Sequence, residues 1–515
     1  MTACSSQVAV PPDCDPYWVE VLEGSGFGVG QIGDVPAPVA LLLPDKGGTR
    51  SPALRTLVER LRRLGTPLVC GAEWGGLLLG QEPRSVRGIG ISGRGGIFTG
   101  VSSVRMPGRF PLLAGANFGR IWPGGEAAVV LRAKDPLLCV LPLPDAQRLL
   151  GAGAELTAFP CGEASAVHEV VARVDHGGVR RLVLGALREV CRAARRPLVR
   201  KATAPAGYSS TFAFRVDADG FDLAATRATL AGLAAAALRA TWFVDVERHL
   251  AQGEAGKQAI HAIAAAGHEV QSHYFHHYTY RDARANERNL RRSLAELAEL
   301  GIVVNAAAAP FGTWNQGLDV AVRRCGLAWT SEFSRSYDDV VSKRDGRKDS
   351  LWQVAVHPVC PKLLLDRGLS ESQIQLYFAA RVTQAFERGD PAVLYGHPIG
   401  ELERLPGLLF GLGELGAFEP GSVWRPTLSR LVEFEAARRA QPLELSWDGR
   451  LLSGESPGPA GLLVQMPDAE PESSLPRATD PTAELPKEWQ AAALRSARWR
   501  GRRLRLARLA REIRR

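Results

Sequence analysis

Short apolar runs alternate with helical patterns at a regular spacing from Thr211 onward. The run Thr211–Val216 precedes a stretch rich in alanine and leucine, and the next run, Ala240–Val246, precedes a second helical stretch. Parallel strands need a long crossover between them, usually a helix, so this alternation predicts an α/β domain built on a parallel sheet. Functional side chains of such domains lie at the carboxyl ends of the strands, so the residues that follow each apolar run are the first candidates.

The first 200 residues show a similar but less regular alternation. Val39–Leu43 and Pro67–Cys70 read as buried strands, and Pro52–Leu64 between them reads as a helix with an apolar stripe. We therefore predict an α/β module over residues 1–200, of the Rossmann or flavodoxin-like type or of the glutamine-amidotransferase-like type. The glycine-rich stretch Gly88–Gly100 carries no clear phosphate-binding signature and is interpreted as a loop.

The chain changes character after the second α/β domain, which we place at residues 201–440. Residues 441–466 predict a small β segment, and residues 467–486 are rich in proline, glutamate and serine, as disordered linkers are. Residues 487–515 carry Lys487 and ten arginines against two glutamates, a net charge of +9. That equals the net charge of the whole chain, so the rest of the chain is neutral on balance.

Apolar residues follow a helical spacing within this basic tail: Trp499, Leu506, Leu509 and Ile513. Basic amphipathic helices bind anionic membrane surfaces or acidic partners, and the alternative is a solvated terminal helix. We do not expect nucleic-acid binding, because no recognisable nucleic-acid-binding fold accompanies the charge.

Cysteine usage and the lack of targeting patterns predict a cytoplasmic location. The eight cysteines are scattered without a Cys-x-x-Cys pair, which is typical of reduced, buried thiols. Met1–Asp15 shows no secretion pattern, and no apolar run reaches the roughly 18 residues that a membrane span needs. We expect a cytoplasmic protein that is peripheral at the inner membrane surface if its tail binds anionic lipid.

Four of the ten histidines lie within Gly267–His277. His273 and His277 are four residues apart, so on a helical turn they would share one face and could bind one metal ion. A catalytic zinc ion normally takes three protein ligands, so a further ligand must come from elsewhere. Asp217 and Asp219 follow an apolar run, and in a strand their side chains point to the same side.

These segments together resemble the polysaccharide deacetylase (NodB homology) family, also called carbohydrate esterase family 4. The first motif of that family is typically Thr-Phe-Asp-Asp-Gly, and Phe214–Gly220 resembles it with Ala218 inserted between the two acids. The second motif is His-Ser/Thr-x-x-His, and His273–His277 is similar to it with Tyr274 in the hydroxyl position.

Two later segments resemble the remaining motifs, in the family's order. The third motif, Arg-x-Pro-Tyr/Phe-Gly, is matched by Ala308–Gly312 except that Ala308 replaces the arginine. The last motif is a histidine after a buried strand, matched by His397 after Val393–Gly396. The resemblance covers roughly residues 200 to 440 and implies a distorted (β/α)7 barrel there.

The resemblance also implies roles for individual residues. It implies three ligands for a divalent metal ion: Asp219, His273 and His277. Zn²⁺ is the first expectation, with Co²⁺, Mn²⁺ and Ni²⁺ as alternatives. Asp217 would be the base that accepts a proton from the attacking water, and His397 the acid that protonates the departing amine. The turn formed by Pro310, Phe311 and Gly312 would bind the substrate. The Phe311 N–H in this turn would bind the oxyanion.

Two departures from the family pattern concern the catalytic aspartate and the histidine loop. In the family the arginine of the third motif orients and charges the catalytic aspartate, which Ala308 cannot do. Arg215 precedes Asp217 by two residues on the same strand face, so we predict that Arg215 supplies the missing cation. Tyr274 lacks the short hydroxyl group of serine or threonine, so we expect the loop between the histidines to differ.

These residues predict a metal-dependent hydrolase that removes an N-acyl group, first of all acetyl, from a sugar or polysaccharide. One alternative is hydrolysis of a non-sugar or cyclic amide. Another is a non-catalytic carbohydrate-binding or scaffold module in exopolysaccharide or envelope assembly. The residues also have structural alternatives: Asp217 and Asp219 could cap the next helix, and His397 could be a buried, hydrogen-bonded histidine. His276 is expected to pack near the site rather than bind the metal.

Overall fold

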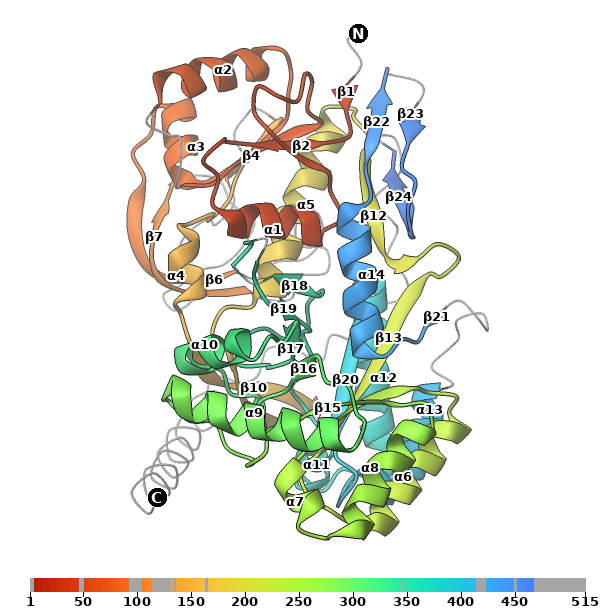
Figure 1. Ribbon diagram of the computed structural model, residues 1–515. Helices are drawn as coiled ribbons and strands as arrows, with labels where there is room; N and C mark the ends of the chain where they lie inside the picture. The colour runs from red at the N-terminus through yellow and green to blue at the C-terminus, as the bar shows by residue number, and fades with distance from the viewer. Residues whose placement is uncertain are drawn as a thin grey trace.

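The protein is described by a computed structural model, in which two sheet-containing halves pack against each other (Figure 1). The structure describes residues 4–45, 51–91, 104–113, 131–132, 136–162, 165–343, 345–347, 349–413, 423–448 and 452–466. The predicted linker 467–486 and basic tail 487–515 therefore lie outside the described residues. Among the described residues, no helix combines the length and the apolar character that crossing a bilayer requires.

Six strands form the N-terminal sheet, in the order β3-β2-β4-β5-β9-β8. Five of them are parallel: β2 (Val8–Val10), β3 (Val29–Gln31), β4 (Ala40–Leu43), β5 (Leu68–Cys70) and β9 (Leu138–Val140). The edge strand β8 (Leu131–Arg132) is antiparallel to β9. Numbered along the chain, the parallel strands have the order 2-1-3-4-5, which flavodoxin-like sheets share. The type of this module and its boundary at residue 200 stay predictions.

Helices cover both faces of the N-terminal sheet, because successive strand residues point to opposite faces and both sets are apolar. Val8, Val10 and Leu42 pack in one core with α1 (Pro16–Gly24) and α5 (His176–Ala193). The intervening residues, such as Ala9 and Leu41, pack in a second core with α2 (Pro52–Arg63) and α3 (Ala72–Leu79). The short helix α4 (Ala146–Leu150) follows β9. The predicted elements at Val39–Leu43, Pro52–Leu64 and Pro67–Cys70 are confirmed as β4, α2 and β5.

Two antiparallel strand pairs accompany this sheet. The first joins β6 (Arg84–Ile91) to β7 (Val104–Leu112). Our interpretation of Gly88–Gly100 as a loop is therefore wrong for Gly88–Ile91, which continue β6; residues 92–103 lie outside the described residues. The second pair, β10 (Ala154–Gly162) and β11 (Ser165–Ala172), reaches the other half of the molecule, where the Ala172 N–H donates to the Phe333 carbonyl at 2.9 Å.

A curled sheet of seven parallel strands forms the second half, in the order β19-β17-β16-β15-β14-β13-β20. Its strands are β13 (Ser210–Ala218), β14 (Ala240–Val244), β15 (Glu269–Ser272), β16 (Ala306–Ala307), β17 (Trp329–Thr330), β19 (Trp352–Gln353) and β20 (Ala392–Gly396). β18 (Ser342–Lys343) pairs antiparallel with β19. β21 (Val423–Trp424) pairs parallel with the start of β13. The His357 N–H donates to the Val393 carbonyl at 2.9 Å, which ties the chain after β19 to β20. The result is a mixed α/β fold with a half-barrel sheet, as the strand–helix alternation predicts.

The helices around this sheet are α6 (Leu223–Ala235), α7 (Val246–Leu250), α8 (Glu254–Ala265), α9 (Ala283–Glu299), α10 (Gln316–Arg324), α11 (Pro361–Leu365), α12 (Glu371–Glu387) and α13 (Pro406–Gly413). Five of them, α6, α7, α9, α10 and α12, begin at side chains that accept hydrogen bonds from their first turns. Asp222 caps α6 and Asp282 caps α9, whereas Ser370 and Gln373 form a capping box at α12. Along β13, Phe212, Phe214 and Val216 pack toward the helices. The alternate residues Arg215 and Asp217 therefore point into the curled sheet.

The C-terminal segment returns to the N-terminal half. The helix α14 (Leu428–Ala440) follows β21, which contains Trp424. The strands β22 (Glu444–Trp447), β23 (Leu452–Glu455) and β24 (Ala460–Gln465) do not form a separate unit. β22 pairs with β1 (Cys4–Ser5), and β24 pairs with β12 (Leu198–Pro205), which itself crosses the predicted domain boundary at residue 200.

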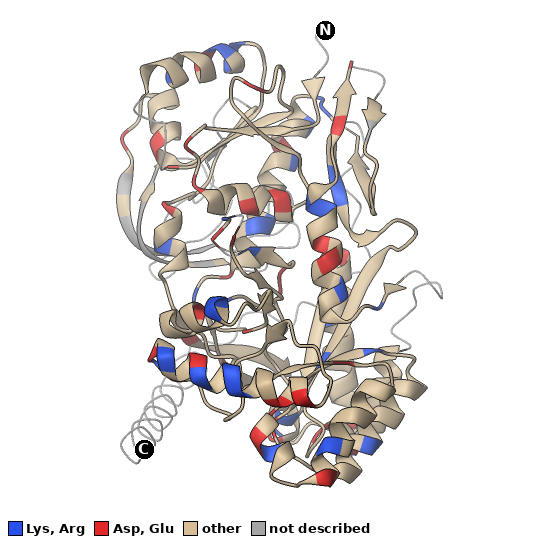
Figure 2. Cartoon of the chain, viewed as in Figure 1, with Lys and Arg blue, Asp and Glu red and all other residues tan. Residues whose placement is uncertain are grey.

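Buried ion pairs join the two halves. Arg180 and Arg181 on α5 reach Asp390, which lies just before β20, at 2.6 and 3.0 Å, and Arg180 also binds Asp339 at 2.8 Å. A second set involves the end of α14, whose basic positions lie against the N-terminal half beside acidic ones (Figure 2). There Arg439 pairs with Glu20 of α1. These contacts join the N-terminal half to the curled sheet and to α14.

Candidate functional site

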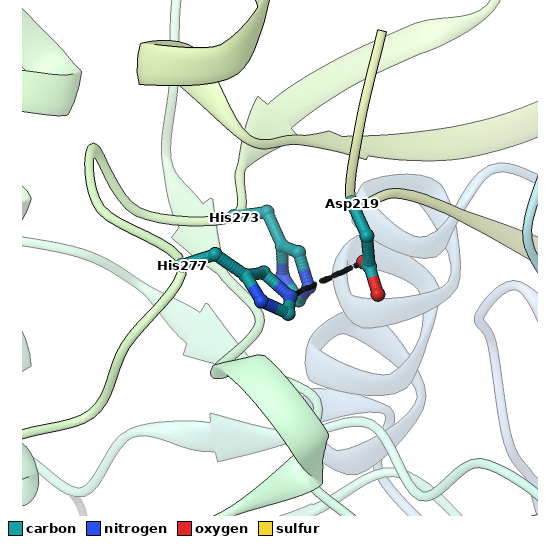
Figure 3. A group of neighbouring side chains, drawn as sticks. All are labelled: Asp219, His273 and His277. Atoms are coloured by element: carbon teal, nitrogen blue, oxygen red, sulfur yellow. Dashed lines mark hydrogen bonds and ion pairs between the residues drawn. The ribbon is translucent and has the colours of Figure 1, made fainter. Parts of the chain in front are cut away.

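Asp219 and the histidine pair meet at the ends of β13 and β15 (Figure 3). These two strands are separated in the sheet by β14. The Asp219 Oδ1 lies 3.0 Å from His273 Nε2 and 3.3 Å from His277 Nε2. The two Nε2 atoms lie 3.1 Å from each other. Three atoms of the kinds that bind Zn²⁺ thus point at one spot, as the sequence predicts.

The histidine pair lies on a loop and not on a helical turn, so our expectation of a helical turn is wrong. His273 directly follows β15, and the chain then bends, with Tyr274 in the left-handed region at φ 70°. The Tyr274 N–H donates to Ser272 Oγ at 3.0 Å, and Ser272 Oγ in turn lies 2.7 Å from Ser293 Oγ. The short hydroxyl group that holds this bend therefore comes from Ser272, one residue before the motif, and not from Tyr274.

The donor set fits a divalent cation in its orientation. His273 Nδ1 lies 2.7 Å from the Ala308 carbonyl, so Nδ1 carries the proton of the neutral ring and Nε2 keeps a lone pair for a ligand. Asp219 Oδ1 is buried, and apart from the two histidine nitrogens no group among the described residues lies close enough to hydrogen-bond to it, which is costly for a carboxylate oxygen unless a cation occupies the spot.

The pKa values describe the same site without a cation. Burial alone would raise the pKa of Asp219, but His273 and His277 hold it well below its usual value, so the carboxylate is ionised. Burial would lower the pKa of His273, and Asp219 outweighs it and raises that pKa. Metal ligation requires neutral imidazoles, so binding of a cation would release the protons that this pairing retains.

Asp217 lies beside this cluster, in a bidentate ion pair with Arg215. Arg215 Nε and Nη2 each lie 2.6 Å from one oxygen of Asp217, and Nη1 donates to the backbone carbonyl of Ser331. Arg215 is fully buried, with its guanidinium 5.0 Å from the Phe243 ring centre and 5.5 Å from that of Tyr395. The structure thus places the Arg215 guanidinium against Asp217, the candidate base. We predicted this cation there, in place of the third-motif arginine, whose position is occupied by Ala308.

His397 lies on the opposite side of Asp219, at the end of β20. His397 Nε2 lies 3.5 Å from Asp219 Oδ2, and Nδ1 lies 2.6 Å from Glu401 Oε1. The His397 N–H also donates to Glu401 Oε2 at 3.0 Å, and the Cys360 thiol is close to both side chains. Burial would lower the pKa of His397, but the Glu401 carboxylate outweighs it and holds that pKa well above its usual value.

The predicted substrate-binding turn lies next to His277. Pro310–Gly312 form a short 3-10 turn in which Phe311 adopts φ 59°, and its ring centre lies 5.0 Å from that of His277. The Phe311 side chain is 58% exposed, which is unusual for a phenylalanine and leaves an aromatic face at the site. Gly312 has φ 56°, and a Cβ there would lie 2.3 Å from the Phe333 ring, so only glycine fits.

Sequence reasoning missed a buried acid, Glu332, that supports this turn. Glu332 Oε1 accepts a hydrogen bond from the Ala309 N–H at 3.1 Å, and its other oxygen is buried without a partner among the described residues. The side chain is fully buried, and burial raises its pKa to about 7. It follows Thr330 and Ser331 after β17, so its place at a strand end was the one available signal.

We expect Glu332 to make the protein less stable as pH rises. In the unfolded chain a glutamate ionises with a pKa near 4.3, whereas in the fold it stays protonated up to about pH 7. The free energy of unfolding should therefore fall between about pH 4.5 and pH 7 and level off above, by on the order of 3 kcal/mol. Denaturant unfolding of the wild type and Glu332→Gln across this range measures the effect. As pH rises, the free energy of unfolding of the wild type should fall relative to that of Glu332→Gln. A difference in unfolding free energy that stays constant with pH would contradict the expectation.

The geometry excludes the helix-cap alternative for the two acids, whereas the alternative for His397 stays open, because its side chain is hydrogen-bonded to Glu401. Asp222, and not Asp217 or Asp219, caps α6. His276 points away from the cluster, with Nδ1 2.7 Å from Glu247. Two positioning contacts, Glu401 on His397 and Ser272 on the loop, carried no recognisable sequence signal, because they depend on how the chain folds back near each strand end. The catalytic and metal-binding roles themselves stay predictions.

Comparison with known proteins comes from solved structures. No protein-family model matches the sequence, and no curated protein matches it. A Mycobacterium smegmatis protein described as a polysaccharide deacetylase matches 45% of this chain and 92% of its own, with 21% identity and a TM-score of 0.37. A family 4 carbohydrate esterase from Streptomyces lividans matches 43% of this chain and 92% of its own, with 16% identity and a TM-score of 0.31.

A carbohydrate esterase family 4 pseudoenzyme from Bacillus anthracis also matches, over 43% of this chain and 65% of its own, with 12% identity and a TM-score of 0.32. These three solved structures are thus described as a polysaccharide deacetylase, a family 4 carbohydrate esterase and a pseudoenzyme of family 4.

Proposed function

We propose that this protein is a metal-dependent hydrolase that removes an N-acyl group, first of all acetyl, from a sugar or polysaccharide. One observation carries the proposal: Asp219 faces the two histidines with one oxygen and His397 with the other, while Asp217 lies within 4.8 Å of both Asp219 and His397. A base, a ligand set and an acid therefore surround one spot. That is the set of groups that amide hydrolysis requires.

Asp219, His273 and His277 would hold the cation. Two imidazole nitrogens and one carboxylate suit Zn²⁺ best, and Co²⁺, Mn²⁺ or Ni²⁺ can use the same donors. When bound, the ion would supply Lewis acidity to the acyl oxygen and to the attacking water. The chain's own residues then orient the substrate and move the protons.

Asp217 would take the proton of the attacking water. Its two oxygens are held by Arg215, so the carboxylate keeps one orientation. Because Arg215 is buried and stacked between two rings, this geometry costs no reorganisation when the substrate binds. Arg215 would thus be a positioning residue.

His397 would give a proton to the departing amine nitrogen. The Glu401 carboxylate accepts from His397 Nδ1, which leaves Nε2 directed toward Asp219 and the site. The raised pKa keeps the ring protonated near neutral pH, as a general acid must be.

The turn that contains Phe311 would receive the substrate. Its backbone N–H would bind the oxyanion, as the resemblance implies, and its exposed ring offers an apolar face beside the metal ligands. A sugar ring has an apolar face of its own that can lie against an aromatic side chain. This supports a glycan over a small, fully polar amide.

Replacing Glu401 with glutamine should lower kcat while leaving metal content unchanged. The amide keeps the shape of the side chain but removes the charge that keeps His397 protonated, so the amine leaves more slowly. We expect a loss of roughly 10- to 100-fold, less than the roughly 100- to 10,000-fold that a general acid supplies in full. Glu403→Gln is the matched control, because Glu403 accepts only the nearby Gly400 N–H among the described hydrogen bonds. Equal kcat in the Glu401→Gln variant and the wild type would contradict the role of Glu401.

The proposed function is tested by acetate release. Protein loaded with Zn²⁺, Co²⁺ or Mn²⁺ is incubated with N-acetylglucosamine oligomers, and the acetate and the free amine that are released are measured. We expect the two products in equal amounts. Release above a metal-free control supports the hydrolase. Binding of the oligomers without release, in metal-loaded protein, would favour the scaffold alternative, and release from cyclic amides alone would favour the non-sugar alternative.

We further propose a location at the cytoplasmic face of a membrane, through the basic tail. Its support is the sequence: a net +9 within residues 487–515, together with helically spaced apolar residues. Co-sedimentation of the protein with vesicles that contain anionic lipid, compared with neutral vesicles and with a chain ending at residue 486, tests this proposal.

A further inference from the structure

The peptide group that joins Ala308 to Ala309 is held from both sides by side chains. On one side its carbonyl accepts a hydrogen bond from His273 Nδ1 at 2.7 Å. On the other side its N–H donates to Glu332 Oε1 at 3.1 Å. The carbonyl and the N–H of a trans peptide point in opposite directions, so Glu332 and His273 flank this one group. Two hydrogen bonds therefore connect a buried acid to a candidate metal ligand.

The order of the strands explains this arrangement. β16 lies between β15 and β17, and the Ala308–Ala309 peptide follows β16 directly. His273 directly follows β15, and Glu332 lies two residues past the end of β17. Within the sheet a peptide group pairs with the backbone of the neighbouring strands. At this position the two partners are instead side chains from the ends of those strands.

The path from Glu332 to His273 is shielded from water. Ala308, Ala309 and Glu332 are fully buried, and His273 is 1% exposed. Glu332 is itself held in place, because the side-chain amide of Gln353 donates to its backbone carbonyl at 3.1 Å. Removing the acceptor at Glu332 would therefore leave the Ala309 N–H buried without a partner rather than hydrated.

The hydrogen bond from the Ala309 N–H strengthens the one from His273. Hydrogen bonds in a chain polarise one another, so an acceptor on a peptide N–H makes the carbonyl of that peptide a better acceptor. The carbonyl in turn fixes the proton on His273 Nδ1 and the plane of the ring, and Nε2 is left directed at Asp219, 3.0 Å away (Figure 3). Contacts of this kind to a metal-binding histidine typically contribute about 10- to 100-fold to metal affinity.

The same peptide leads into the substrate-binding turn. The Ala309 carbonyl accepts from the Gly312 N–H at 3.0 Å, and this bond closes the turn Pro310–Gly312. The contact with Glu332 therefore fixes His273 and the start of the turn relative to each other.

We propose that Glu332 is a positioning residue of the metal centre, which acts on His273 through the Ala308–Ala309 peptide. Glu332 touches neither the ion nor the reacting atoms. Its carboxyl oxygen holds the peptide, the peptide holds the imidazole, and the imidazole presents Nε2 to the ion. This inference rests on the proposed metal centre, and it adds a residue that lies outside the four sequence motifs.

The Zn²⁺ dissociation constant of the full chain, measured by competition with a chromogenic chelator, tests the proposal. We expect Glu332→Leu, which offers no acceptor, to bind Zn²⁺ about 10- to 100-fold more weakly than the wild type. Glu332→Gln keeps an oxygen for the Ala309 N–H and should bind within about threefold of the wild type. Asp390→Asn is the matched control for lost stability, because Asp390 is a buried acid that binds Arg180 and Arg181 rather than the metal ligands. It should bind Zn²⁺ like the wild type.

Failure of this inference and failure of the metal centre give different results. A wild type that binds no Zn²⁺ would contradict the metal centre and this inference with it. Equal dissociation constants in the wild type and Glu332→Leu would overturn the role of Glu332 and leave the metal centre standing. Equal weakening in Glu332→Gln and Glu332→Leu would overturn the path through the peptide, because the charge and not the hydrogen bond would then act on the ion.

Glu332→Asp decides the question if Glu332→Leu does not fold. The aspartate keeps the charge, but its shorter side chain withdraws the acceptor from the Ala309 N–H. We expect this variant to bind Zn²⁺ several-fold more weakly than the wild type. Unchanged affinity would overturn the proposal.

Discussion

Replacing Asp217 with asparagine is expected to lower kcat by roughly 100- to 10,000-fold, the contribution of a general base. Asparagine keeps the shape of the side chain but cannot accept a proton, so the attacking water is no longer deprotonated at this position. The metal ligands are other residues, so metal content should stay the same. The variant also leaves Arg215 buried without its counter-charge, so its stability must be measured in parallel.

The measurement is acetate release per metal-loaded chain, with circular dichroism and thermal unfolding as a check on folding. Asp222→Asn is the matched control, because Asp222 is exposed and caps α6, where asparagine serves equally well. That variant should keep wild-type kcat. Full activity in a folded Asp217→Asn variant would mean that another group takes the proton.

Replacing Asp390 with alanine should cost on the order of 3 to 5 kcal/mol of unfolding free energy, the second large effect. Asp390 is buried, and it binds both Arg180 and Arg181, at 2.6 and 3.0 Å. Removing one member of a buried ion-pair network leaves its partners desolvated and less well compensated, which costs far more than loss of an exposed pair. Here Arg180 would keep Asp339, and Arg181 would keep Asp175 at 3.7 Å. Since the two arginines belong to the N-terminal half and Asp390 to the curled sheet, the loss should weaken the packing of both halves.

Denaturant unfolding of the full chain measures this effect. Asp366→Ala is the matched control, because Asp366 pairs with Lys362 on the surface, with both side chains more than half exposed. Such pairs contribute about 0 to 1 kcal/mol. Similar losses in the two variants would show that the ion pairs between the halves do not hold them together.

The strand-end positions of the site were predictable from sequence because periodicity and motif agree there. The run Thr211–Val216 is confirmed within β13, and the acids that follow it lie at the strand end as predicted. The pairing of Arg215 with Asp217 was predictable for the same reason, because residues two apart in a strand share a face. Local rules were sufficient for each of these residues.

The contacts that the sequence did not reveal all depend on tertiary structure. Glu332 supports the turn before Phe311 from another strand end, and Glu401 reaches His397 only because the chain turns back after β20. Spacing alone favoured a helical turn for His273 and His277, whereas the loop is shaped by the positive φ of Tyr274 and by Ser272. No periodic pattern encodes such contacts.

The C-terminal strands are a similar case. A hydrophobic pattern over residues 441–466 predicts strands but not their partners. β22 pairs with β1, more than 400 residues earlier in the chain, and β24 pairs with β12. Such long-range pairing depends on how distant parts of the chain pack together, which the pattern of a single segment does not encode.

Metal content per chain, measured by mass spectrometry on the purified full-length protein, tests the central claim most directly. The account predicts about one divalent ion per chain in the wild type, lost in both His273→Ala and Asp219→Ala. The ion should be retained in His276→Ala, whose imidazole lies in the same loop but pairs with Glu247. Absence of bound metal after incubation with Zn²⁺, Co²⁺ and Mn²⁺, or equal metal content in all four proteins, would contradict the assignment of Asp219, His273 and His277 as a metal centre.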